Sequence, residues 1–298
     1  MQRLTDARRE SSGSALGGEA LPPRAVARPA APPTPVERAL ATMRGPLDRP
    51  LPLATLAEIA GLSPFHFART FRQATGIPPG QFLAALRLEQ AKRLLLTTDL
   101  TVTEICFAVG YDSIGTFTTR FTQFVGLPPG QMRRLPETLG EALARLPADR
   151  LMPPTANPGD TASGVVGRIS PDVEADTLIF VGLFPGAIPQ GRPVVGMALA
   201  APGPFRLPAP PDGRYHLLAA AVPHPQRAHD ATAALLPGAA LRVGRAPGTL
   251  VVRGGRGGVS AAIALRPPQP TDPPVLVALP ALLLACCPRL RPARDGRN

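Results

Sequence analysis

Two stretches of this chain repeat each other at an offset of 50 residues: SPFHFARTFRQATGIPPGQF at 63–82 and SIGTFTTRFTQFVGLPPGQM at 113–132. Both begin with a serine, carry two phenylalanines four residues apart, and end in Gly-x-Pro-Pro-Gly-Gln. Residues spaced by four lie on one face of a helix, so these phenylalanine pairs, Phe67/Phe71 and Phe117/Phe121, are predicted to face a core. The repeat therefore predicts two copies of one helical unit.

A short helix is predicted ahead of each copy. The segments TLAE at 55–58 and TVTE at 101–104 have the pattern of capping boxes, in which the Thr hydroxyl and the Glu carboxylate each accept a backbone N–H. Each short helix runs into a glycine, Gly61 or Gly110, which can take the positive φ that ends a helix in a tight turn. A short helix, a glycine turn and a second helix form a helix-turn-helix, here twice.

Between the repeats, the segment PGQFLAALRLEQAKRLLLTT at 79–98 has apolar residues at helical spacing and no helix breaker after Gly80. We expect one long helix that fixes the first helix-turn-helix unit relative to the second.

Residues 36–135 resemble the DNA-binding domain of AraC/XylS-type transcriptional regulators, through LAEIAGLSPFHFARTFRQATGIPPGQF and TVTEICFAVGYDSIGTFTTRFTQFVGLPPGQMRR. The resemblance covers about a third of the chain. It implies two helix-turn-helix units that read successive major grooves on one face of promoter DNA. By position in the family motif, it implies base contacts from Phe65, Ala68, Arg69, Ile114, Gly115, Thr118 and Thr119.

Side-chain chemistry ranks these base contacts. Arg69 can make a bidentate contact with guanine, and Thr118 or Thr119 can contact a base or a phosphate, whereas the apolar side chains offer at most contact with thymine methyl groups. Many family members carry an arginine where this chain has Thr119, and here Arg120 follows instead. Phosphate contacts, which add affinity without sequence information, are predicted from Arg72, Lys92, Arg93, Arg120, Arg133 and Arg134.

The chain is predicted to be a multidomain α plus β protein, an all-α double helix-turn-helix domain followed by an all-β sandwich. Short apolar runs cut by Pro and Gly, such as TLIFVGLF and VLVAL, predict the strands of the sandwich. The predicted parts are a disordered arm at 1–35, the DNA-binding domain at 36–135, a linker at 136–163, the sandwich at 164–288 and a basic tail at 289–298.

One stretch of the β domain, GPFRLPAPPDGRYHLLAAAVP at 203–223, resembles transthyretin-like, carboxypeptidase-regulatory β-sandwich modules. The alternation predicts that Phe205 and Leu207 point inward before Asp212-Gly213 turns the chain. Tyr215, Leu217 and Ala219 should then return on the same face. The resemblance implies a sandwich fold without catalysis.

Composition limits the partners and the compartment. The net charge of +11 favours a polyanionic partner, and the cysteines Cys106, Cys286 and Cys287 cannot build a disulfide framework. The longest apolar run, VLVALPALLLACC at 275–287, has 13 residues and is too short to cross a bilayer. We expect a cytoplasmic protein that does not enter membranes.

No catalytic or metal-binding pattern stands out, so we expect no enzyme activity, no cofactor and no metal. His224, His229 and Asp230 lie in a proline-rich loop, and with His216 they lack the spacing of a ligand set. The expected partners are double-stranded promoter DNA, RNA polymerase, and an unknown effector or dimer partner at the β domain. Two alternatives remain open: an enzyme that the helical domain delivers to DNA, and a non-specific architectural DNA-binding protein.

Overall fold

The computed structural model describes residues 32–144, 164–170, 177–223, 235–236, 238–254 and 261–279. From residue 33 onward these belong to one compact unit, Pro33–Asn298. Several predicted features lie outside the described residues: arm residues 1–31, linker residues 145–163, His224, His229, Asp230, the pair Cys286-Cys287, and the tail 289–298. Within the described part of the chain, no helix is long and apolar enough to span a membrane.

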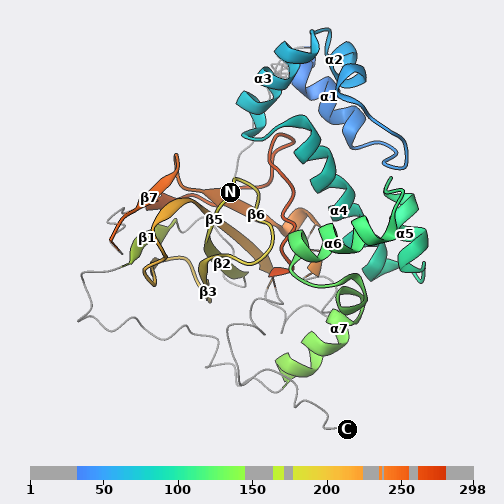
Figure 1. The fold of residues 1–298 in the computed structure, drawn as a ribbon. Helices are drawn as coiled ribbons and strands as arrows, with labels where there is room; N and C mark the ends of the chain where they lie inside the picture. The colour runs from blue at the N-terminus through green and yellow to red at the C-terminus, as the bar shows by residue number, and fades with distance from the viewer. Residues whose placement is uncertain are drawn as a thin grey trace, which may run out of the picture. The chain divides into compact units, whose positions relative to one another are not determined.

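The helical domain contains the two predicted units and the long helix between them (Figure 1). Helices α2 and α3 form the first helix-turn-helix unit, α5 and α6 form the second, and α4 connects them. The helices are α1 (Pro35–Met43), α2 (Leu53–Ala60), α3 (Pro64–Thr75), α4 (Pro79–Thr97), α5 (Val102–Ala108), α6 (Ile114–Val125) and α7 (Pro129–Ala144).

The helix starts confirm one predicted capping box and correct the other. At α5, the Glu104 N–H donates to Thr101 Oγ1 at 3.2 Å, and the Thr101 N–H donates to Glu104 Oε2 at 2.7 Å. The predicted box at Thr55 is wrong, because α2 already begins behind an extended Pro52 and Thr55 therefore lies inside the helix. A capping box that the sequence analysis did not predict opens α1 at Thr34, so the helical domain begins before residue 36.

Both predicted turn glycines have a positive φ, 69° at Gly61 and 79° at Gly110. At Gly110 a Cβ atom would lie 2.3 Å from the carbonyl oxygen of Leu47, so no side chain fits there. The close approach of the loop that contains Leu47 and the positive φ both require glycine at this turn.

The phenylalanines of the repeat form the centre of the helical core, as predicted. Phe67, Phe71, Phe117 and Phe121 are each 0% exposed. The ring centroids lie 5.5 Å apart in the first pair and 5.6 Å apart in the second. The two units are therefore packed in nearly the same way.

Helix α7 is longer than the sequence analysis predicted. It continues through Pro136 to Ala144, into residues that we had assigned to the linker. A proline inside a helix removes one backbone hydrogen bond, which disfavours continuation of the helix. Leu135 and Leu139 on either side of Pro136 are buried in the helical core, and this packing favours continuation of the helix.

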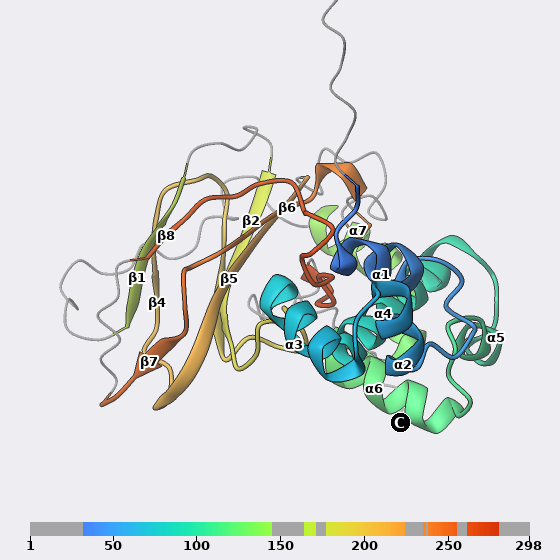
Figure 2. The ribbon, with the colours of Figure 1, turned by 90° about the horizontal axis from the view of Figure 1, so that it is seen from above.

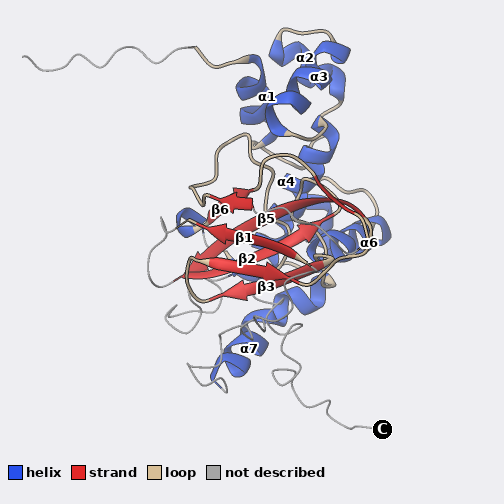
Figure 3. Cartoon of the chain, turned by 90° about the vertical axis from the view of Figure 1, so that its left-hand side faces the viewer, coloured by secondary structure: helices blue, strands red, loops and turns tan. Residues whose placement is uncertain are grey.

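The β region contains two sheets (Figure 3). In the three-stranded sheet, β1 lies between β4, which is antiparallel to it, and β8, which is parallel to it. The five-stranded sheet has the antiparallel order β3-β2-β5-β6, with β7 also paired to β5. The strands are β1 (Val165–Ile169), β2 (Thr177–Phe184), β3 (Val195–Leu199), β4 (Pro204–Leu207), β5 (Gly213–Pro223), β6 (Arg242–Arg245), β7 (Leu250–Val252) and β8 (Ala261–Ile263).

The five-stranded sheet is covered on both faces, and all 8 residues of β2 are buried. On one face, Ile179 and Val181 pack in a cluster with residues of the three-stranded sheet, such as Val165. On the other face, Leu178 and Phe180 pack in a different cluster, which includes Val277 and Leu279.

The predicted turn at Asp212-Gly213 does not join two neighbouring strands of one sheet. Strand β4 pairs with β1 in the three-stranded sheet, whereas β5 belongs to the five-stranded sheet, so the chain crosses from one sheet to the other. The predicted inward residues are nevertheless buried together, because the two sheets share this core. Phe205, Leu207, Tyr215, Leu217 and Ala219 all belong to the cluster.

The predicted strand VLVAL, residues 275–279, belongs to neither sheet, and we call it the bridging segment. Its alternate residues pack in two different cores: Val277 and Leu279 against the five-stranded sheet, and Leu276 and Ala278 in the helical core. Its backbone N–H groups donate to loop and helix carbonyls rather than to a strand. Leu276 and Val277 both donate to Pro189 at 3.1 Å, and Ala278 donates to Val125 at 3.3 Å. Figure 2 shows this segment in red between strands and helices.

Candidate nucleic-acid interface

The candidate DNA-reading helices α3 and α6 have the same construction. Each has 12 residues, begins behind a serine and ends at a glycine in the left-handed conformation. Ser63 Oγ accepts the N–H of His66 at 3.4 Å, and Ser113 Oγ accepts the N–H of Thr116 at the same distance. The caps fix where each helix starts, and this position decides which side chains lie on its outer face.

The predicted base-contact residues lie on the outer faces of these helices, opposite the buried phenylalanines. In α3, Phe65 is 81% exposed and Arg69 is exposed, while Ala68 is half-buried. In α6, Ile114 is 46% exposed. Gly115 and Thr119 are exposed beside it, and Thr118 is half-buried. The structure therefore brings each predicted set together on one accessible helix face, and their contacts with bases remain predictions.

His66 is a further candidate that the sequence analysis did not select. It is exposed in the first turn of α3, next to Phe65 and three residues before Arg69, so it lies on the same end of the helix. An imidazole can donate or accept a hydrogen bond at a base edge or a phosphate. Its place in the first turn behind the Ser63 cap is a signal that the sequence already contained.

Four of the predicted phosphate-contact residues are accessible, and one is not. Arg72, Arg93, Arg120 and Arg134 are exposed. Lys92 is 6% exposed, and its Nζ donates to the carbonyl oxygen of Val275 at 2.9 Å. The phosphate contact predicted for Lys92 is therefore wrong, because the ammonium group is buried against the bridging segment.

Burial also changes the protonation of Lys92. Removal from water disfavours the charged form and lowers the pKa of Lys92 to about 8, although the nearby Glu89 carboxylate opposes the shift. The side chain holds α4 to the bridging segment rather than attracting DNA.

Arg133 has a structural role in the same domain. Its half-buried guanidinium donates to the carbonyl oxygen of Thr98 at 3.1 Å and also to that of Leu100. These bonds fix the loop between α4 and α5, so its donors are directed at the protein backbone. The prediction of a phosphate contact finds no support in this arrangement.

The predicted base-contact residues of the second unit differ in charge from those of the first, which include Arg69. The set of the second unit contains no charged residue, and Arg120 lies one position beyond Thr119. The guanidinium of Arg120 is close enough to Tyr111 to affect its ionisation. Burial raises the pKa of Tyr111, and the positive charge of Arg120 partly opposes that rise.

Two helix pairs, each with an exposed and serine-capped second helix, are joined by one long helix, and this arrangement defines a double helix-turn-helix DNA-binding domain. A family profile described as "Helix-turn-helix domain" matches residues 56–135. The chain is similar to the HTH-type transcriptional activator AarP of Providencia stuartii, with 31% identity over 98 residues, which cover 33% of this chain and 73% of AarP. The chain belongs to the family of AraC-type helix-turn-helix transcriptional regulators.

Another relative matches over a similar share of the chain. The HTH-type transcriptional regulator YobQ of Bacillus subtilis (strain 168) is 38% identical over 79 residues, which cover 26% of this chain and 33% of YobQ. The chain thus spans about a third of the length of this curated relative. Among solved structures, the DNA-binding domain of AdpA in complex with a target DNA has 31% identity, covers 39% of this chain and 99% of that chain, and gives a TM-score of 0.33.

Proposed function

We propose that the whole protein is a sequence-specific transcriptional regulator that places α3 and α6 in two successive major-groove segments of promoter DNA. The observation that carries this proposal is the pair of exposed helix faces joined by α4, a helix of 19 residues. At about 1.5 Å per residue, α4 is roughly 28 Å long, which is comparable with the roughly 34 Å between major-groove segments one turn apart.

In this proposal the two units read DNA unequally. Arg69 makes a bidentate contact with a guanine, and Phe65 lies against a thymine methyl group. Thr118 and Thr119 supply weaker contacts from α6, because a hydroxyl bonds to either a base or a phosphate and discriminates less. Arg72, Arg93, Arg120 and Arg134 hold the phosphates on either side.

The β region is proposed to be a sandwich module that senses an effector or binds a second copy of the chain. The shared core of the two sheets supports the sandwich, and the described residues contain no group of three or more His, Cys, Asp or Glu side chains suited to a metal. We also propose RNA polymerase as a partner, by analogy with AarP, which is named a transcriptional activator.

Two steps test the proposal. Duplexes that the protein binds are first selected from random DNA, and the selected sequence is then footprinted. We expect one chain to protect two unlike half-sites in tandem, about one helical turn apart. Inserting five base pairs between the half-sites turns one of them to the opposite face of the duplex, and affinity should fall. Inserting five base pairs outside the site is the control and should have no effect.

The other outcomes distinguish the alternatives. If affinity survives the internal insertion, one helix-turn-helix unit does not contact DNA. Uniform protection without a preferred site would indicate an architectural protein, and chemical change of the DNA without protection would indicate an enzyme.

A further inference from the structure

A cavity of about 240 Å³ lies between the five-stranded sheet and the segment 264–279 that crosses over it. Aromatic and aliphatic side chains form most of its wall: Phe180, Ala198, Leu218 and Ala220 on the sheet, and Val275 and Leu279 on the crossing segment. An engineered cavity of about 150 Å³ with a similar apolar lining accommodates benzene. The cavity therefore has room for one ring and a short chain.

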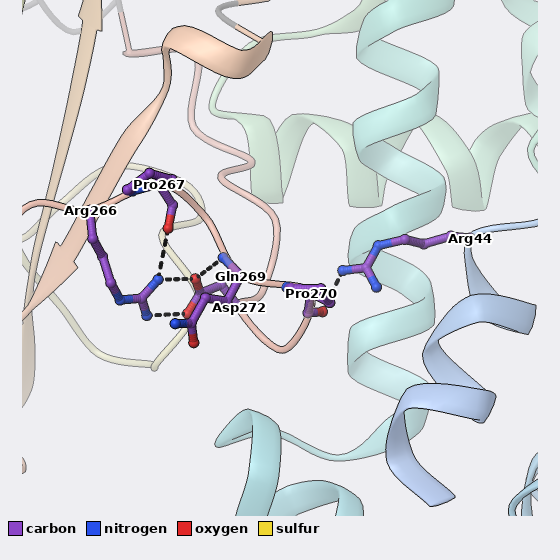
Figure 4. Close-up of polar contacts among 6 residues, drawn as sticks. All are labelled: Arg44, Arg266, Pro267, Gln269, Pro270 and Asp272. Carbon is purple, nitrogen blue, oxygen red and sulfur yellow. Dashed lines mark hydrogen bonds and ion pairs between the residues drawn. The ribbon is translucent and has the colours of Figure 1, made fainter. Parts of the chain in front are cut away.

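The charged side chains that line the cavity, among the described residues, are Arg245, Arg266 and Asp272. Arg266 binds Asp272 through both of its terminal nitrogens, at 2.6 Å and 2.8 Å (Figure 4). The backbone N–H of Gln269 donates to the same carboxylate at 2.6 Å. Burial alone would raise the pKa of Asp272, but these hydrogen bonds, together with the positive charges of Arg266 and Arg245, outweigh burial and lower the pKa, so the carboxylate is ionised.

Since Arg266 and Asp272 neutralise each other, the lining has an excess of one positive charge, on Arg245. Arg245 is exposed, so a neutral apolar molecule would fill the cavity without a bond to this guanidinium. A carboxylate would form a charge-assisted hydrogen bond with Arg245, and such bonds are about twice as strong as neutral ones.

We propose that this cavity binds a small monoanionic organic acid, with an apolar body of about one ring and a short chain between the sheet and Val275, and with its carboxylate at Arg245. The size follows from the cavity volume, the apolar body from its walls, and the single negative charge from the balance of lining side chains.

The residues around this site also contact the DNA-binding domain. A Cβ atom on Gly76, the C-cap of α3, would lie 3.6 Å from Arg245 Nη1. The crossing segment is bonded to the helices at two places, because Arg44 donates to the carbonyl oxygen of Pro270 (Figure 4) and Lys92 donates to that of Val275. An acid bound at Arg245 and Val275 would therefore change contacts that hold α3 and α4. This coupling, unlike the binding itself, rests on the proposed function.

Calorimetric titration of the full-length protein with phenylacetate and phenylbutyrate tests the binding. We expect at least one acid to bind about tenfold more tightly than the alcohol with the same apolar body, since the alcohol lacks the charge. Failure of both acids to bind, or equal affinity for acid and alcohol, would overturn the proposal.

Two matched pairs of variants locate the site. Arg245→Gln should lower the affinity for the acid to that of the alcohol, whereas Arg253→Gln, at an exposed arginine outside the cavity lining, should have no effect. Ala198→Phe fills the cavity and should abolish binding, whereas Ala200→Phe, at an exposed position beyond the same strand, should not. Circular dichroism confirms that each variant is folded. Unchanged binding in Arg245→Gln and Ala198→Phe would place the ligand elsewhere.

DNA affinity measured with and without saturating phenylbutyrate tests the coupling separately. We expect a change of about fivefold or more, in the usual range for coupled sites. If the acid binds by calorimetry and DNA affinity stays the same, the coupling is wrong and the site stands. If the protein binds no specific DNA in either condition, the proposed function fails, while the calorimetric result still decides the cavity.

Discussion

Helices α3 and α6 have the same length, the same serine cap and the same left-handed glycine at the end, yet their outer faces differ. The face of α3 carries a large exposed aromatic ring, Phe65, and a cation, Arg69. The corresponding face of α6 carries Ile114, a glycine and small hydroxyl side chains. The repeat thus preserves the residues that build each helix pair and varies those on the exposed outer face, where base contacts are predicted.

The surroundings of the two helices differ as well. At the end of α6, the carbonyl oxygens of Phe124 and Val125 accept backbone N–H groups from the loop at Gly191 and from the bridging segment at Ala278. At the end of α3, the corresponding neighbour is the guanidinium of Arg245, near Gly76. The second unit is therefore bonded through its backbone to the β region, whereas the neighbour of the first unit at this place is a side chain.

The largest expected effect tests whether the phenylalanine pairs of the two units contribute equally to stability. Phe67→Ala and Phe117→Ala each remove a fully buried ring from equivalent positions, and each should lower the free energy of unfolding by about 3–5 kcal/mol. Urea denaturation of the full-length protein measures the change. Phe65→Ala removes an exposed ring and is the control, with an expected effect below about 0.5 kcal/mol. A small loss for one core variant alone would show that the two units are not equal in stability.

The next prediction concerns α4, which joins the two units. Lys92 has a folded pKa of about 8 and an unfolded value near 10.5, so the unfolded chain binds more protons between these pH values. Stability should therefore rise by roughly 3 kcal/mol as pH increases through this window. Lys92→Met should remove this gain, measured as the free energy of unfolding against pH.

Arg93→Met is the matched control for Lys92, since the neighbouring arginine is exposed. It should retain the rise in stability. A rise of the same size in Lys92→Met would mean that another group causes it.

A smaller effect distinguishes the reading surfaces of the two units. Arg69→Ala should cost about 1–3 kcal/mol on the specific site and relax the preference at one base pair, because a bidentate guanine contact is lost. Thr119→Ala should cost less than about 1 kcal/mol, since a single neutral hydrogen bond is lost. Fluorescence anisotropy on specific and random duplexes measures both. An equal loss for Arg69→Ala on random DNA would identify a phosphate contact instead.

The smallest effect compares the first helices of the two units. Thr101→Ala removes a capping hydroxyl from α5 and should cost about 1 kcal/mol of stability. Thr55→Ala lies inside α2 and should leave stability unchanged or slightly increased, because alanine is the better helix former. Thermal unfolding of both variants provides the measurement. Equal losses of stability would indicate that Thr55 caps α2 after all.

The sequence predicted the helical units well because their signals are local. Ser63 and Ser113 as caps, the turn glycines and the spacing of four between phenylalanines each act within a few residues. Thr55 was misassigned because the TLAE pattern fits a capping box wherever it occurs, and the pattern does not show that α2 begins three residues earlier, behind Pro52.

The position of Lys92 could have been predicted from the same periodicity. It falls four residues after Leu88 and three before Leu95, on the buried stripe of α4. The phosphate contact was predicted from its charge, although its spacing indicates burial. Which carbonyl it would meet, at Val275, depends on packing far along the chain and has no local signal.

The β region was predicted less well because pairing of strands is not local. The runs at 177–184 and 204–207 coincide with β2 and β4, since alternation and flanking turns mark them. That β1 pairs with the distant β8, or that β4 and β5 belong to different sheets, follows from packing of the whole domain. The bridging segment has the composition of a strand, but it lies outside both sheets and its alternate residues pack in two cores.

The bridging segment also delays completion of the helical core during synthesis. The helices of the DNA-binding domain leave the ribosome first, but Leu276 and Ala278 of the same core follow about 135 residues after the end of α7. At about 5–20 residues per second, roughly 7–27 seconds separate the two events. During that interval the nascent helical domain exposes an apolar patch that the finished protein covers, and chaperones have their longest access to it then.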